Sequence, residues 1–137
     1  MNRIIVCDDE PHIVEGLRFL LRSPDREIVV TYSGEDALKR LDEQRPDLLI
    51  IDIMMPGMSG LEVVSTLRAD PATKDLPIII ITAKGQARDA TMAQEIWNAM
   101  VVAKPFQPQE LRQMVTSTLE QGVCPQPNPC NAPRFIG

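Results

Sequence analysis

Four short apolar runs, each followed directly by a polar residue, constrain the fold of this chain more than any other feature. The runs span residues 4–7, 48–51, 78–81 and 101–103, and the polar residues that follow them are Asp8 and Asp9, Asp52, Thr82 and Lys104. Runs of this length that are apolar on both faces are typical of strands in a parallel sheet. The polar residues should therefore share one edge of that sheet, where open α/β sheets bind their ligands.

Strand and helix patterns alternate along the chain. Strands are predicted at residues 3–7, 27–31, 47–52, 77–82 and 101–103, and helices at 11–22, 34–43, 60–69, 86–97 and 108–121. Right-handed crossovers between parallel strands place helices on both faces of the sheet, which predicts a doubly wound α/β fold with five strands and five helices. In the common strand order 2-1-3-4-5, the aspartates would lie at the switch point between the first and third strands.

The chain divides into one folded domain and a tail. Residues 1–121 contain every periodic segment, whereas residues 124–133 contain four prolines and no periodicity. We therefore predict a single domain over residues 1–121 and an extended proline-rich tail over residues 122–137. Cys124 and Cys130 lie in this tail, where we expect them to be free thiols, with a disulfide or a shared metal site as the alternatives.

The composition excludes several classes of protein. The net charge of −5 argues against a general nucleic-acid binder, which would carry a basic surface. The apolar run near the N-terminus is too short for a signal peptide, and no run approaches the roughly 20 residues of a membrane span. We expect a cytoplasmic protein without a membrane partner.

The polar residues at the strand ends suit phosphoryl chemistry. Three carboxylates repel one another unless a bound cation offsets their negative charge. Magnesium prefers one or two carboxylates together with phosphate oxygen as its ligands. A carboxylate beside such a metal can attack phosphorus, and an ammonium and a hydroxyl can hold phosphate oxygens. The turn-rich loop at residues 53–60 is expected to leave Asp52 exposed for this role.

Four motifs resemble the receiver domain of two-component response regulators. They are Cys-Asp-Asp-Glu at 7–10, Asp-Ile-Met-Met-Pro-Gly-Met-Ser-Gly at 52–60, Ile-Thr-Ala-Lys at 81–84 and Lys-Pro-Phe at 104–106. The resemblance spans residues 3–121 and implies a flavodoxin-like fold. It further implies a phosphoacceptor (Asp52), Mg²⁺ or Mn²⁺ ligands (Asp8, Asp9, Asp52 and the Met54 backbone carbonyl), a switch hydroxyl (Thr82) and a phosphate-binding lysine (Lys104).

The resemblance also implies partners. A histidine kinase or a histidine phosphotransfer protein would supply the phosphoryl group, and a downstream protein would dock on the fourth helix, fifth strand and fifth helix. The chain would act as a phosphoacceptor rather than an enzyme, with no nucleic-acid partner. A hydrolase with an aspartate nucleophile is disfavoured, because Asp52 lacks the Asp-x-Asp pattern of such phosphatases.

Two alternatives remain open. Val101 stands where the family usually carries an aromatic residue that reports phosphorylation, and Trp97-Asn98 replaces a usual Gly-Ala pair. These departures favour a phosphorylation-independent interaction module, whereas the complete set of acids, hydroxyl and lysine favours the switch. The chain could also be the receiver part of a longer response regulator.

Overall fold

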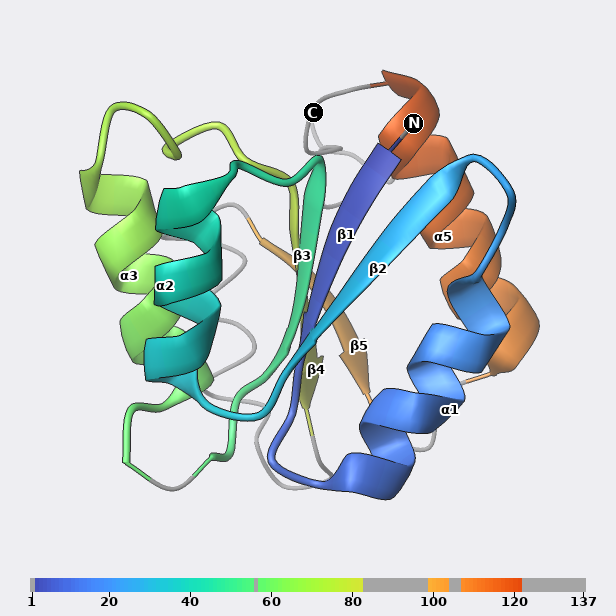
Figure 1. Ribbon diagram of the computed structural model, residues 1–137, viewed down its shortest axis with the longest axis horizontal. Coiled ribbons are helices and arrows are strands. Elements are labelled where there is room, and N and C mark those ends of the chain that lie inside the picture. The colour runs from blue at the N-terminus through green and yellow to red at the C-terminus, as the bar shows by residue number, and fades with distance from the viewer. Residues whose placement is uncertain (1, 56, 83–98, 104–106, 122–137) are drawn as a thin grey trace.

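Five parallel strands form one sheet in the computed structural model, which describes residues 2–55, 57–82, 99–103 and 107–121 (Figure 1). The strand order is β2-β1-β3-β4-β5, so the predicted order is confirmed. The strands are β1 (Asn2–Cys7), β2 (Arg26–Thr31), β3 (Leu48–Asp52), β4 (Ile78–Thr82) and β5 (Met100–Ala103).

Helices cover both faces of the sheet, as predicted for a doubly wound fold (Figure 1). The described helices are α1 (Pro11–Leu21), α2 (Gly34–Glu43), α3 (Gly60–Ala69) and α5 (Pro108–Gln121). Helices α1 and α5 pack on one face, and α2 and α3 pack on the other. The predicted helix at 86–97 lies outside the described residues. Within the described ranges, no helix is long and apolar enough to cross a membrane.

The apolar core has two layers because side chains alternate along each strand. Ile5, Leu49 and Ile80 pack with α2 and α3, whereas Ile4, Ile50 and Ile79 pack with α1 and α5. All six side chains are fully buried. Each contributes roughly 1.5–3 kcal/mol through removal of apolar surface from water. The core therefore holds the strands in a single register.

Local capping fixes where α2 and α3 begin. The Ser33 hydroxyl accepts a hydrogen bond from the Asp36 backbone N–H at 3.1 Å, and the Ser59 hydroxyl accepts one from the Glu62 N–H at 3.3 Å. Each serine satisfies a backbone donor that has no partner within its helix. Both helices begin directly after these serines, so their N-termini and the carboxyl ends of the strands lie at the same end of the sheet.

Candidate functional site

The register of the sheet brings Asp8, Asp9 and Asp52 together. Cys7 on β1 pairs with Ile51 on β3, so Asp8 and Asp52 are the next residues of two adjacent strands. One carboxylate oxygen from each of the three aspartates lies within 4.8 Å of the others. Asp8 and Asp52 are buried, and Asp9 is the most accessible of the three. The predicted acidic cluster is therefore present at the carboxyl edge of the sheet.

Asp52 is only 4% exposed, so the expectation that its loop leaves it exposed was wrong. The loop folds back over the end of β3, where Ile53 and Met55 are also buried. The Met54 backbone N–H donates to the Asp52 carboxylate at 3.2 Å, which fixes the side chain within its own loop. Asp52 is thus held in place beside Asp8 and Asp9.

Gly60 contributes to this arrangement in a way that the sequence did not reveal. Its N–H donates to the Ile53 carbonyl at 3.0 Å, and a Cβ at this position would overlap the Asp52 carbonyl oxygen. Glycine is needed here for close packing, because the N-terminus of α3 lies directly against the Asp52 backbone. The only sequence signal was its place at the end of the motif at 52–60.

Of the remaining predicted residues, Thr82 and Met54 lie beside the aspartates along the same edge. Thr82 is the last residue of β4 and 4% exposed, and its neighbour Ile81 pairs with Asp52. Met54 follows Asp52 in the loop, with its side chain 63% exposed. Lys104 comes directly after β5, whose Ala103 pairs with Thr82, but Lys104 itself lies outside the described residues.

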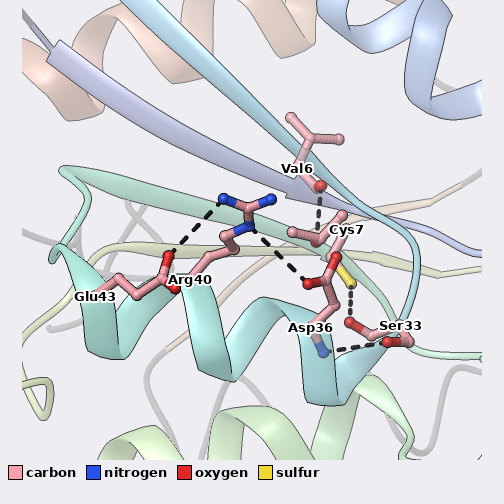
Figure 2. A network of polar contacts seen from close by, with 7 residues as sticks. Val6, Cys7, Ser33, Asp36, Arg40 and Glu43 are labelled. Atoms are coloured by element: carbon pink, nitrogen blue, oxygen red, sulfur yellow. Dashed lines mark hydrogen bonds and ion pairs between the residues drawn. The ribbon is translucent and has the colours of Figure 1, made fainter.

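A buried thiol connects the end of β1 to the start of α2 (Figure 2). Cys7 is 1% exposed, and its Sγ donates to the Ser33 carbonyl at 3.2 Å. Figure 2 also shows Ser33 capping Asp36, which forms a 4.0 Å ion pair with Arg40 on the outside of α2. The exposed ion pair adds little stability, whereas the thiol contact positions the β2–α2 connection against the strand that carries Asp8 and Asp9.

Cys7 should resist thiol reagents while the protein is folded. Burial raises the pKa of its thiol to about 11, and the charges of nearby Asp8, Asp36 and Asp52 add to the increase. A Cys124→Ser, Cys130→Ser variant retains Cys7 as its single thiol. We expect Ellman's reagent to modify this variant roughly a hundredfold more slowly in buffer than in urea. Equal rates would contradict the buried position.

The acidic cluster fits a hard divalent cation. The three oxygen donors are carboxylates, the ligand type that Mg²⁺ and Mn²⁺ prefer, and they come from two adjacent strand ends that the core holds fixed. Asp8, Asp9 and Asp52 could hold such an ion, which could then accept a phosphate oxygen. The buried hydroxyl of Thr82, at the end of the next strand, could donate to the same phosphate.

Known proteins are similar to this chain in sequence. The family profile of the response regulator receiver domain matches residues 4–116. The DNA-binding response regulator MtrA of Mycolicibacterium smegmatis is 39% identical over 120 residues, which cover 88% of this chain and 51% of that protein. The alkaline phosphatase synthesis transcriptional regulatory protein PhoP of Bacillus subtilis is 32% identical over 127 residues, which cover 93% of this chain and 52% of that protein. The chain thus spans about half the length of these curated relatives.

Solved structures of response regulator proteins are similar to this chain in fold. A candidate response regulator from Chloroflexus aurantiacus J-10-fl superposes with a TM-score of 0.80 at 35% identity, covering 87% of this chain and 98% of that one. A response regulator receiver domain protein from Clostridium thermocellum gives a TM-score of 0.80 at 25% identity, covering 88% and 96%. The strand order, the acidic edge and these matches agree, and the chain belongs to the response regulator receiver domain family.

Proposed function

We propose that this receiver domain accepts a phosphoryl group on Asp52 within a two-component phosphorelay. The observation that carries the proposal is the approach of three carboxylates to within 4.8 Å at the carboxyl ends of β1 and β3. A bound divalent cation would offset the repulsion between these charges and draw a phosphate oxygen toward Asp52. In this proposal Asp8, Asp9 and the Met54 carbonyl hold Mg²⁺ or Mn²⁺, while Thr82 and Lys104 hold phosphate oxygens.

The proposed transfer is a substitution at phosphorus. One carboxylate oxygen of Asp52 forms a bond to phosphorus and yields an acyl phosphate. The bond between phosphorus and the donor atom breaks, and the donor leaves with that electron pair. The donor atom is an imidazole nitrogen for a phosphohistidine and an oxygen for acetyl phosphate. The chain would be the acceptor in this step and not an enzyme acting on a separate substrate.

The proposed partners are proteins. A histidine kinase or a histidine phosphotransfer protein would donate the phosphoryl group, and a downstream protein would contact residues 86–97, β5 and α5. The net charge of −5 argues against DNA contact by this domain. MtrA is named as DNA-binding, and this chain covers 51% of it. If the chain is part of a longer protein of that kind, we expect any DNA contact to belong to the other part.

Intact mass spectrometry tests the proposed function directly. The chain is incubated with acetyl phosphate in the presence of magnesium, and a parallel sample contains an excess of a chelator. We expect the mass of one phosphoryl group to be added in magnesium and none to be added with the chelator. If no phosphoryl group is added in magnesium, the chain is not a phosphoacceptor.

Magnesium should stabilise the folded chain through the same aspartates. A ligand that binds only the folded state raises the free energy of unfolding, here by roughly 1–3 kcal/mol at concentrations well above its dissociation constant. Asp9→Asn should reduce this gain and, by removing one of three like charges, raise the melting temperature in the absence of metal. Asp42→Asn, on an exposed residue of α2, is the control and should retain the full gain. A wild-type melting temperature that is indifferent to magnesium would contradict the metal site.

Val101 supports a second candidate function. It lies half-buried on β5 and has no aromatic ring to move between buried and exposed positions. A phosphorylation-independent interaction module would need no such movement. Beryllofluoride with magnesium, a mimic of the phosphoryl group, distinguishes the two. A phosphorylation switch predicts changes in the emission of Trp97, the single tryptophan, and in the amide spectra of β5 and α5. If neither changes in a chain that accepts phosphate, the interaction module is the better account.

A further inference from the structure

A second polar surface lies at the opposite end of the sheet from the aspartates. Arg22 follows the C-terminus of α1 and Arg26 begins β2, whereas Asp8 and Asp52 lie at the carboxyl ends of their strands. An open pocket of about 450 Å³ lies between α1 and β2 and is lined by Glu15, Arg18, Phe19, Arg22, Arg26 and Ile28. We refer to these lining residues as the arginine pocket.

Phe19 lies outside the core-facing stripe of α1. Val14, Leu17 and Leu21 form the buried stripe, while the Phe19 side chain is 68% exposed. The Arg22 guanidinium lies over its ring, 4.4 Å from the centroid. A single exposed apolar residue is common on protein surfaces. An aromatic ring stacked with an arginine in a pocket has the composition typical of the centre of a protein interface.

The charge of the arginine pocket is opposite to that of the whole chain. Three arginines and one glutamate line it, which gives two net positive charges in a chain of net charge −5. Glu15 pairs with Arg18 at 2.7 Å. The helix dipole favours Arg18 and Arg22 near the C-terminus of α1, but it does not account for the arginine on β2 or for the exposed ring.

Arg26 is fixed within the pocket. Its Nη1 donates to the Leu21 carbonyl at 3.1 Å, and its Nη2 donates to the Thr116 hydroxyl on α5 at 3.0 Å. A guanidinium held in this way presents its charge with little further loss of side-chain entropy. Arg22 is held less firmly, by its contact with Phe19, and is available to bind a carboxylate.

We propose that the arginine pocket is a docking site for a short acidic segment of a partner protein. An apolar side chain of the segment packs on Phe19, and flanking carboxylates accept hydrogen bonds from Arg18 and Arg22. Guanidinium groups bind carboxylates in a bidentate manner, which suits a segment rich in glutamate or aspartate. A long polyanion such as nucleic acid is disfavoured by the chain's overall negative charge and by Glu15 in the pocket. Docking here leaves the aspartate edge free.

A fluorescent peptide in which glutamate alternates with leucine serves as the probe, with a glutamine–leucine peptide as its control. We expect fluorescence polarisation to show at least about tenfold tighter binding of the glutamate peptide, with the difference shrinking as salt increases. Phe19→Ala and Arg22→Gln should each weaken binding about tenfold. Arg40→Gln removes the same charge from α2, on the other face of the sheet, and should leave binding within about twofold.

Amide spectra locate the bound peptide, and melting curves check that the variants are folded. Shifts should concentrate on residues 15–28, which include the end of α1 and the start of β2. Equal affinity for the two peptides, an equal loss in Arg40→Gln and Arg22→Gln, or shifts centred elsewhere would overturn the proposal. It would also fail if a labelled oligonucleotide bound the pocket more tightly than the peptide, or if the chain proved to self-associate and Phe19→Ala abolished that association.

Discussion

An Asp52→Asn substitution is expected to abolish phosphoryl transfer to this chain while leaving it folded. The amide has the shape of the carboxylate, so the buried site retains its packing, but its nitrogen cannot attack phosphorus. Removal of a single essential nucleophile lowers the rate of covalent chemistry by at least on the order of 10³-fold. Intact mass after incubation with acetyl phosphate and magnesium measures the loss. The melting temperature of the variant without metal should equal or exceed that of wild type, since one of three clustered charges is gone.

Two further variants show whether the loss is specific to Asp52. Asp42→Asn, on an exposed residue of α2, should be labelled like wild type. Asp9→Asn should still be labelled, but more slowly, because it loses a proposed metal ligand and retains the acceptor. Borohydride reduction of the acyl phosphate followed by peptide mapping would then place the modification within the peptide that contains Asp52. Labelling of Asp52→Asn at the wild-type rate would mean that another aspartate is the acceptor.

The fold and the placement of the aspartates could be predicted because both depend on local sequence. Runs such as residues 48–51 are apolar on both faces, and a sheet covered by helices on both sides buries them fully. Once the strands are parallel, the residues that follow Cys7 and Ile51 must meet at one edge. The starts of two helices likewise follow local rules, since Pro11 begins α1 with a fixed backbone angle and Ser33 caps α2 with a local hydrogen bond.

The burial of Asp52 and the presence of the arginine pocket could not be predicted, because both depend on packing between distant segments. A loop rich in glycine and methionine reads as exposed, yet it folds over β3 and leaves Asp52 only 4% exposed. The helical spacing of Val14, Leu17 and Leu21 accounts for the buried stripe of α1, and it gives no role to Phe19. The contact of Arg26 with Thr116 joins residues 90 positions apart, and no local pattern reports such a pair.

The second large effect is expected for Gly60→Ala, because the added methyl group should displace the backbone of Asp52, the proposed phosphoacceptor. A Cβ at this position would overlap the Asp52 carbonyl oxygen and lie 2.9 Å from the Asp52 carbonyl carbon and from the Ile53 Cα. These are backbone atoms at the end of the central strand β3 and of the residue that follows it, and they cannot move aside as the end of a flexible side chain can. We expect Gly60→Ala to lower the free energy of unfolding by roughly 1–3 kcal/mol, as overpacking does in a core.

Gly16, in another helix, serves as the control that distinguishes the effect of this close contact on stability from the effect of helix propensity. Alanine in a helix is more favourable than glycine by about 1 kcal/mol, so propensity alone predicts that both substitutions stabilise the protein. Gly16 lies on α1, and a Cβ there would meet no atom within 4 Å among the described residues, apart from its chain neighbours and the backbone of its own helix. Urea unfolding should therefore show Gly16→Ala to be slightly more stable than wild type and Gly60→Ala to be less stable. The folded fraction of Gly60→Ala should also accept the phosphoryl group at least about tenfold more slowly, because the Asp52 backbone is displaced. A stabilised Gly60→Ala variant with normal labelling would show that the close approach of α3 does not position the acceptor.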